Sequence, residues 1–134
     1  MAIESAAVKP STIGEWRRLS GPGGAADRGV KDEMRCNLLR KLQAHEPLFD
    51  GIRGYEETVL PQIANAILAR HNFILLGLRG QAKSRILRGL VNFLEPEIPY
   101  IAGCEIHDHP LRPICRVCRE VVAEQGENAP IAWL

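Results

Sequence analysis

The stretch that decides the expected fold runs from Phe73 to Ser84 and reads FILLGLRGQAKS. Its first four residues are continuously apolar and end at Gly77, which is typical of a strand buried on both faces in a parallel sheet. A glycine, four residues, a small residue, a lysine and a serine follow, the order of a Walker A loop with Ala82 at the second glycine position. An alanine fits that position only where φ is negative. The sequence therefore predicts a phosphate-binding loop between a strand and a helix.

Each part of this loop has a physical role in holding a nucleotide. Glycines let backbone N–H groups turn inward and form a cradle for phosphate oxygens. The ammonium group of Lys83 would reach the β- and γ-phosphates, and the hydroxyl of Ser84 would be a ligand of Mg²⁺. The competing interpretation is a glycine turn in an unrelated α/β protein, with Lys83 and Ser84 merely starting a helix. The residues predicted to bind ATP and Mg²⁺ at the loop are Gly77, Gly80, Gln81, Ala82, Lys83 and Ser84.

Apolar periodicity divides the rest of the chain into a polar leader and a series of helices and strands. Residues 1–30 hold few large apolar side chains and contain Gly-Pro-Gly-Gly, so they are predicted to form a flexible, disordered leader. Beyond the leader, apolar residues at helical spacing predict helices and short apolar runs predict strands, in the order of a parallel βαβ unit. The helices are expected at 31–44, 55–70, 83–94 and 113–125, and the strands at 73–76 and 98–102.

Three segments of the chain resemble a known family. The loop at 77–84 resembles the Walker A variant of MoxR-type AAA+ ATPases and of magnesium-chelatase ATPase subunits. Residues 52–56, Ile-Arg-Gly-Tyr-Glu, are similar to the upstream segment that lies near the adenine in this family. Residues 103–133 resemble a subset of magnesium-chelatase and MoxR-like proteins. The resemblance covers residues 35–134.

The resemblance implies an α/β fold, a partial P-loop NTPase (AAA+) core with parallel strands and flanking helices. It implies ATP and Mg²⁺ as cofactors and places Ile52 and Gly54 beside the base. Full-length relatives are expected to form ring oligomers that remodel a partner or insert a metal. On this interpretation residues 31–134 are the N-terminal part of an AAA+ nucleotide-binding domain.

The parts that hydrolyse ATP are not found in this sequence. Hydrolysis needs a Walker B strand that ends in an acidic pair, and the only Asp-Glu pair, Asp32-Glu33, lies upstream of the phosphate loop. Sensor residues and a lid domain have no room before Leu134. We therefore expect a fragment truncated before Walker B that binds ATP without hydrolysing it, and we predict no catalytic residue.

A second cluster of chemistry-bearing residues follows the strand expected at 98–102. Two of its cysteines are one helical turn apart, and a third cysteine with a histidine could complete a tetrahedral Zn²⁺ site. A redox pair and incidental thiols are the open alternatives. A small zinc-binding interaction module, which would need zinc and not Lys83, is therefore the alternative function. The candidate ligands are Cys104, Cys115 and Cys118, with His107 or His109.

Composition and charge narrow the partners. Lys plus Arg is 17 and Asp plus Glu is 16, so a net charge of +1 gives no electrostatic basis for binding nucleic acid or an anionic membrane. An aromatic content of 5% is too low for a base-stacking platform. No apolar run approaches the roughly 18–20 residues of a membrane span, and Met1–Ala7 lacks the pattern of a secretion signal. The sequence predicts a cytoplasmic protein whose ligand is a nucleotide.

Overall fold

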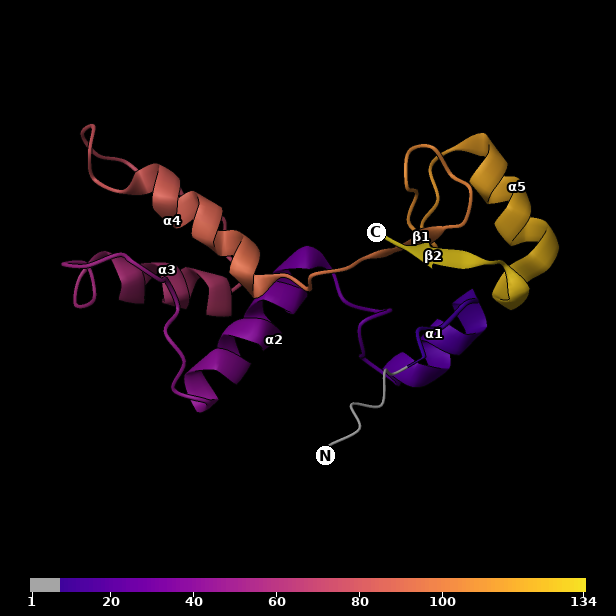
Figure 1. Cartoon of the computed structure of the whole chain (residues 1–134), viewed down its shortest axis with the longest axis horizontal. Coiled ribbons are helices and arrows are strands. Elements are labelled where there is room, and N and C mark those ends of the chain that lie inside the picture. Colours follow the sequence, from indigo (N-terminus) through magenta and orange to yellow (C-terminus); the bar gives the residue numbers. More distant parts are fainter. Residues whose placement is uncertain (1–7) are drawn as a thin grey trace, which may run out of the picture. The chain divides into compact units, whose positions relative to one another are not determined.

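The chain divides into two compact units in the computed structural model, which describes residues 8–134 (Figure 1). Unit 1 combines the N-terminal segment up to Asp27 with Glu97–Leu134, and unit 2 is the intervening segment Arg28–Pro96. Residues 1–7 of the predicted leader lie outside the described residues. Unit 2 is thus inserted into the sequence of unit 1.

Helix α1 (Ile13–Ser20) belongs to unit 1 and is fixed by its N-terminal cap. The side chain of Thr12 accepts a hydrogen bond from the N–H of Glu15 at 3.3 Å. The carboxylate of Glu15 accepts one in turn from the N–H of Ser11 at 2.8 Å. The first bond satisfies an N–H group that the first turn of a helix leaves without a partner, and the second holds the residue before the cap against the helix. Gly21, with φ 67°, ends the helix in a conformation that favours glycine.

The second segment of unit 1 forms a small antiparallel sheet and one helix. Its elements are β1 (Pro99–Ile101), α5 (Arg116–Gln125), the 3₁₀ helix η2 (Gly126–Asn128) and β2 (Ile131–Trp133). The two strands pair with Tyr100 opposite Ala132. An isolated bridge between Thr12 and Pro130 joins the N-terminal segment to the chain just before β2.

The N-terminal segment contributes to the core of unit 1. Ile13 and Trp16 are buried there together with residues of both strands and of α5. The Nε1–H group of Trp133 donates a hydrogen bond to the carbonyl of Pro10 at 3.0 Å. Residues 8–27 are therefore folded into unit 1, where the sequence predicted a flexible leader.

Unit 2 is helical. Its elements are α2 (Val30–Gln43), α3 (Val59–Leu68), α4 (Lys83–Gly89) and the 3₁₀ helix η1 (Leu90–Phe93). Helix α2 packs against α3 and η1, and its Leu38 is fully buried with Phe93. The amide of Asn37 donates a hydrogen bond to the carbonyl of Phe93 at 2.9 Å, so this buried polar side chain is satisfied.

The predicted parallel α/β P-loop core is wrong. Among residues 8–134 the only sheet is the two-stranded antiparallel pair of β1 and β2. The run at 73–76, predicted as a buried strand, pairs with no strand in the described chain, and Ile74 and Leu76 are 82% and 88% exposed. A strand buried on both faces needs neighbouring strands for its hydrogen bonds, and the second predicted strand pairs instead with residues near the C-terminus.

The predicted helices correspond to helices of the structure, with shifted ends. The helix predicted at 31–44 is α2, and the one predicted at 55–70 is shortened to α3. Pro61 lies in the first turn of α3, where a residue without an N–H group disturbs no intrahelical bond. The helix predicted at 83–94 is divided into α4 and η1.

Candidate metal centre

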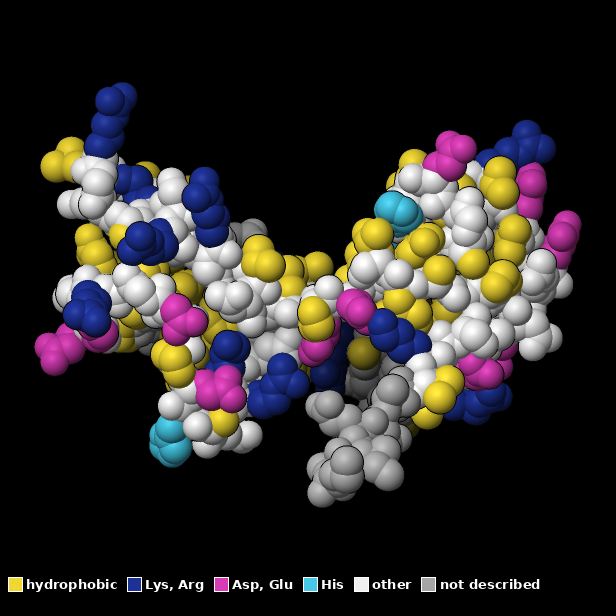
Figure 2. All heavy atoms as spheres, viewed as in Figure 1, with side chains coloured by type: hydrophobic (Ala, Val, Ile, Leu, Met, Phe, Trp, Pro, Cys, Tyr) yellow, Lys and Arg dark blue, Asp and Glu magenta, His cyan; other side chains and the backbone are white. Residues whose placement is uncertain are grey.

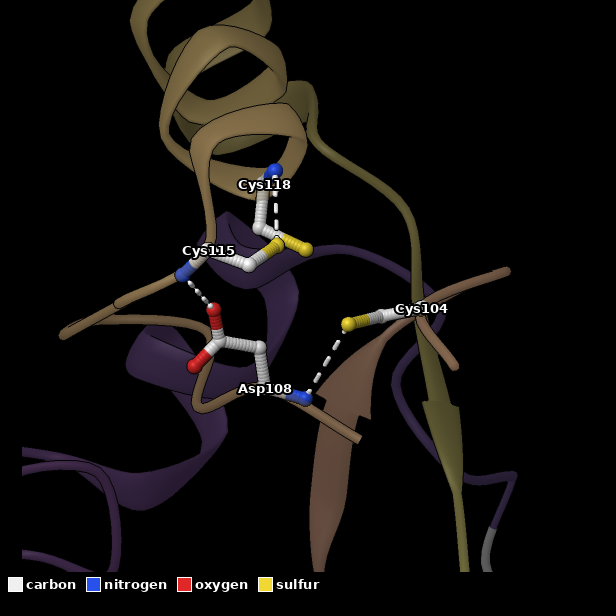
Figure 3. A group of neighbouring side chains, drawn as sticks. All are labelled: Cys104, Asp108, Cys115 and Cys118. Atoms are coloured by element: carbon white, nitrogen blue, oxygen red, sulfur yellow. Dashed lines mark hydrogen bonds between the residues drawn. The ribbon is translucent and has the colours of Figure 1, made fainter. Parts of the chain in front are cut away.

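Three cysteines and one aspartate converge in unit 1. One ligand atom from each of Cys104, Asp108, Cys115 and Cys118 lies within 4.8 Å of every other, and no second group of this kind occurs among residues 8–134. Figure 3 shows the three sulfur atoms directed toward a shared space between the turn after β1 and the start of α5. Atoms this close can share one metal ion, which thiolates bind at about 2.3 Å.

Cys115 and Cys118 meet because they begin a helix. Cys115 is the N-cap residue of α5, and its sulfur accepts a hydrogen bond from the N–H of Cys118 at 3.3 Å (Figure 3). A sulfur here occupies the place that a Ser or Asp oxygen commonly takes at a helix start. This bond fixes the sulfur of Cys115 at the start of α5, next to Cys118.

Cys104 reaches the cluster from the turn that follows β1. Its N–H group donates a hydrogen bond to the carbonyl of Ile101 at 3.0 Å, and Gly103 has φ 80° in this turn. The sulfur of Cys104 accepts a hydrogen bond from the N–H of Asp108 at 3.4 Å. The loop after Cys104 thus folds back over the sulfur and supplies a donor to it.

Asp108 is the carboxylate of the cluster and is only 5% exposed. Its Oδ2 atom accepts hydrogen bonds from the N–H groups of Ile114 and Cys115, both at 2.8 Å. Its Oδ1 atom accepts one from the N–H of His109 at 3.0 Å. A carboxylate at the N-terminus of α5 also meets the positive end of the helix dipole. Asp108 therefore ties the loop to α5 and holds Cys104 close to the helix start.

The same contacts set the ionisation of the cluster. The N–H of Asp108 lowers the pKa of the Cys104 thiol, and the N–H of Cys115 lowers the pKa of the Asp108 carboxyl. Burial raises the pKa of the Cys118 thiol to about 12. Without a metal ion, Cys118 is therefore a neutral thiol at pH 7, whereas Asp108 is ionised. A metal ion that binds Cys118 must displace its proton.

The donor set matches a thiophilic metal ion. Thiolates select Zn²⁺ and Cu(I), whereas Mg²⁺ and Ca²⁺ require several oxygen ligands. The cluster offers three sulfurs and a single carboxylate. Zn²⁺, which binds sets of three cysteines together with one further ligand, fits this composition.

The two histidines near the cluster are engaged elsewhere. The ring of His107, where φ is 50°, lies edge-on to the ring of Tyr100 with 4.6 Å between centroids. The ring of His109 lies edge-on to that of Trp16 at 6.1 Å, and partial burial lowers the pKa of His109. The structure thus places Asp108 in the cluster where the sequence predicted His107 or His109. The feature of the sequence that could have indicated Asp108 is an aspartate in a loop that leads back to a helix N-terminus.

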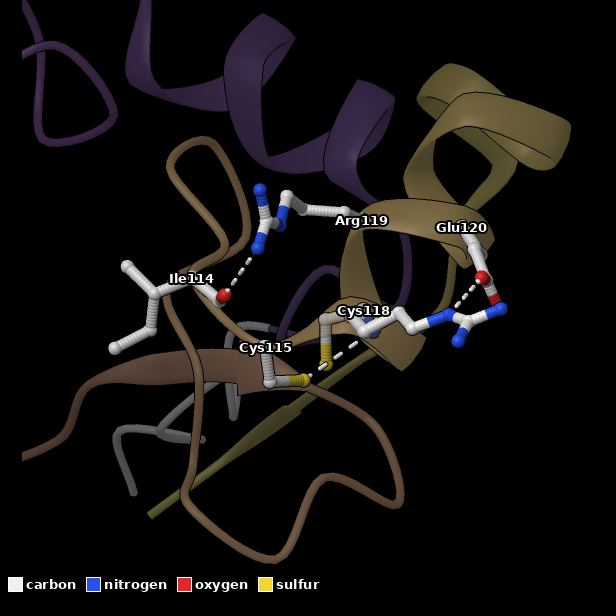
Figure 4. A network of polar contacts seen from close by, with 6 residues as sticks. Ile114, Cys115, Cys118, Arg119 and Glu120 are labelled. Carbon is white, nitrogen blue, oxygen red and sulfur yellow. Dashed lines mark hydrogen bonds and ion pairs between the residues drawn. The ribbon is translucent and has the colours of Figure 1, made fainter.

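The nearest arginines of α5 are held in local contacts. Arg116 pairs with Glu120 one turn later at 2.8 Å. The guanidinium of Arg119 donates a hydrogen bond to the carbonyl of Ile114 at 3.0 Å (Figure 4). This second contact closes the loop onto the first turn of α5 and adds to the bonds that Asp108 makes there.

The predicted phosphate loop of unit 2 is a turn ahead of α4. Gly80 has φ 80° and Ala82 has φ 58°, so the negative φ that an alanine requires at this Walker A position is not found. A residue with a Cβ atom costs roughly 1–2 kcal/mol in this left-handed conformation. The ammonium group of Lys83 donates hydrogen bonds to the carbonyls of Gly77, at 2.6 Å, and Leu78. Lys83 is therefore folded back across its own loop.

A cationic surface pocket of about 680 Å³ surrounds this loop. Lys and Arg side chains gather around the loop and α4, in dark blue at the upper left of Figure 2. No acidic residue lines the pocket, so it favours an anion. The lining residues, which include most of the predicted nucleotide ligands and Ser84, are Arg79, Gly80, Gln81, Ala82, Lys83, Ser84, Arg85 and Arg88.

The residues predicted to border a base do not line this pocket. Ile52 is 7% exposed in the core of unit 2 and lines a second cavity of about 690 Å³. Gly54 is exposed, and its N–H donates a hydrogen bond to the carboxylate of Glu56 at 2.8 Å. Arg85 of the first pocket donates a hydrogen bond to the carbonyl of Gly51, which lines the second, at 3.0 Å.

Comparison with protein-family models, curated proteins and solved structures gives no match to this chain. No helix among residues 8–134 combines the length and the apolar character that crossing a membrane requires. The likeness to MoxR and magnesium-chelatase ATPases therefore stays a prediction from the sequence. Function has to be inferred from the chemistry of the two sites themselves.

Proposed function

We propose that unit 1 is a zinc-binding module in which Cys104, Cys115 and Cys118 hold one Zn²⁺ ion beside Asp108. The convergence of three thiols and one carboxylate within 4.8 Å carries this proposal. Cys104 follows β1, whereas the other two cysteines begin α5, so folding brings these groups together from separate elements. Hydrogen bonds from backbone N–H groups hold two of the sulfurs in place, and the one from Asp108 lowers the pKa of the Cys104 thiol, which favours the thiolate that a metal ion binds.

The zinc ion has a structural role in this proposal. Cys118 is part of the core of unit 1, and Cys104 and Cys115 pack against that core. A bound ion therefore cross-links the turn after β1 to the start of α5 at the margin of the core. Small domains with limited cores often need such a metal. Because the unfolded chain has no preformed site, the free energy of zinc binding becomes free energy of folding.

The metal content of the full chain, purified without chelator, tests the proposal. We expect about one zinc ion per chain by elemental analysis, since a single cluster of this kind is described. Cys104→Ser and Cys115→Ser are expected to lose the metal. Cys36→Ser is the matched control, because Cys36 is a free thiol of unit 2 outside the cluster. A wild-type chain without zinc, or equal zinc in the Cys36 and Cys104 variants, would contradict the proposal.

A second candidate function, carried by unit 2, is the binding of a nucleotide phosphate. It is supported by a pocket that is lined by several cationic side chains and by no carboxylate, next to backbone N–H groups of a glycine turn. The cations are Arg79, Lys83, Arg85 and Arg88. Lys83 must leave the carbonyls of its own loop before it can contact a phosphate. We therefore expect weak binding of ATP with Mg²⁺.

Titration of the full chain with a fluorescent ATP analogue and Mg²⁺ tests this second candidate. Saturable binding should disappear in Lys83→Ala and persist in Lys31→Ala, which removes a cation of the same unit outside the pocket. A zinc chelator should leave the binding unchanged, since the loop and the cysteine cluster belong to different units. A signal that survives Lys83→Ala would refute a role for this loop.

A further inference from the structure

We propose that residues 72–78 of unit 2 bind an extended peptide of another protein as an added β-strand, and that this peptide carries carboxylates at one end. The contact involves no residue of the zinc site, which belongs to unit 1. Three features of the segment support it. They are a backbone without hydrogen-bond partners, apolar side chains that face away from the core, and cations at one end.

The backbone of this segment is not engaged by the fold. In the described chain, residues 71–78 belong to no helix, strand or turn. No hydrogen bond from residues 8–134 reaches an N–H or C=O group of residues 72–76. A row of such groups is the template that the edge of a sheet presents to a strand of another chain. The main-chain contacts of an added strand are therefore available here.

The side chains of the segment alternate between the core and solvent. Phe73 and Leu75 are half-buried and pack against the core of unit 2. Ile74 and Leu76, which alternate with them, are 82% and 88% exposed. An alternation with a period of two is the pattern of an extended strand. The inner side chains fix the segment to unit 2, and the outer pair is left to contact side chains of an added strand.

Cations lie at the C-terminal end of the segment. The ammonium group of Lys83 is bonded to the carbonyls of Gly77 and Leu78, and Arg79 follows them in the sequence. Lys83 and Arg79 line the cationic pocket of about 680 Å³, which Figure 2 shows as dark blue around α4. The four cations of this pocket form no ion pair with a carboxylate among residues 8–134. Carboxylates of the peptide are therefore the complementary charges.

Other occupants satisfy only part of these features. A free nucleotide or a nucleic acid offers phosphates to the cations, but no row of backbone partners. A membrane would take up Ile74 and Leu76, but lipid leaves unpaired backbone groups without partners at a high cost. A second copy would bring like charge, because residues 58–94 contain no Asp or Glu. An acidic extended peptide satisfies the backbone, the apolar side chains and the cations together.

The test measures binding of fluorescent peptides to the full chain. The peptides DEDTVTVT and TVTVTDED bring carboxylates to the cations in antiparallel and in parallel pairing, respectively. One of them is expected to bind saturably, whereas KRKTVTVT, the like-charge control, is not. N-methyl groups along the edge of the bound peptide that pairs with the segment should abolish binding, because they remove its N–H donors. N-methyl groups along the opposite edge should leave binding unchanged.

Variants of the chain locate the contact. Ile74→Ser combined with Leu76→Ser should weaken peptide binding roughly tenfold or more. Leu19→Ser is the matched control, because Leu19 is 72% exposed and belongs to unit 1. Amide exchange in α2 should be the same in the double variant as in the wild type, since both changes are at exposed positions. Arg79→Glu combined with Arg88→Glu should reverse the preference in favour of KRKTVTVT.

The unfavourable outcomes are separable. Failure of both acidic peptides to bind overturns the inference, whereas zinc content and binding of the ATP analogue are independent measurements. Equal binding of the acidic and basic peptides overturns the acidic class, and binding that survives N-methylation of either edge overturns strand pairing. A dimer of the chain that the Ile74 and Leu76 double variant loses would assign the segment to a second copy. Loss by this variant of binding to vesicles of phosphatidylserine and phosphatidylcholine would assign it to a membrane, and either result refutes the peptide.

Discussion

Replacing Cys104 by serine is expected to remove most of the stability that zinc gives to unit 1. In zinc-finger peptides four ligands together contribute about 10–16 kcal/mol, so one thiolate accounts for about 2.5–4 kcal/mol, or roughly 10²–10³-fold in affinity. At free zinc of about 1,000 times the wild-type Kd, the wild-type chain gains about 4 kcal/mol of stability. The Cys104→Ser chain, at about one to ten times its own Kd, gains only about 0.4–1.4 kcal/mol.

Tryptophan fluorescence during thermal unfolding measures this difference in stability for unit 1. The chain has two tryptophans, and both Trp16 and Trp133 belong to unit 1. For a domain of 60–100 residues 1 kcal/mol corresponds to a Tm shift of about 4–8 °C, so zinc should raise the wild-type Tm by well over 10 °C. With chelator present, the wild-type and Cys104→Ser chains should unfold at nearly the same temperature, because Cys104 is only half-buried. Equal zinc-induced shifts in the two chains would refute the assignment of Cys104 as a ligand.

Three further predictions concern stability. Phe93→Ala removes a fully buried ring whose centroid lies 5.6 Å from that of Phe49, and should destabilise unit 2 by about 3–5 kcal/mol. The expected result is faster amide exchange in α2, with an unchanged zinc content. Ala82→Gly relieves the left-handed conformation at φ 58° and should stabilise unit 2 by up to about 1 kcal/mol in urea unfolding; a loss of stability would contradict the strain. Because its folded-state pKa is lowered, chiefly by the N–H of Cys115, Asp108 stabilises the zinc-free fold above its unfolded pKa of about 3.9. That contribution is lost as the pH falls through the lower folded pKa. The loss of stability of the zinc-free chain below about pH 4 should therefore be smaller in Asp108→Asn than in the wild type.

The sequence predicted helices better than it predicted the sheet, because helices depend on local periodicity. Helix α2 follows its apolar spacing almost from end to end. Pro61 favours a late start or a kink in the second predicted helix, and α3 begins at Val59. The run at 73–76 has the composition of a buried strand, but a strand is completed by partners elsewhere in the chain. The second predicted strand, at 98–102, pairs with residues 131–133, and no local pattern in the sequence predicts this pairing.

Part of the metal centre could be predicted from the spacing of its thiols. Cys115 and Cys118 lie one turn apart in any helix, and Cys104 is near them in the sequence. The spacing of the thiols alone could not favour Asp108 over His107, because the two residues are neighbours in the same loop. The left-handed conformation of His107, at φ 50°, turns its ring toward Tyr100 and leaves the next residue facing the cysteines.

The interrupted sequence of unit 1 has a consequence for biosynthesis. All of unit 2 is translated between α1 and β1, so it can fold while α1 still has nothing to pack against. Unit 1 is completed only when Pro130 reaches Thr12 and Trp133 reaches Pro10, contacts that join the two ends of the described chain. Closing such long loops is slow compared with local helix formation. Newly made chains should therefore pass through a stage in which unit 2 is formed and the cysteines of unit 1 are still exposed to oxidants and to competing metal ions.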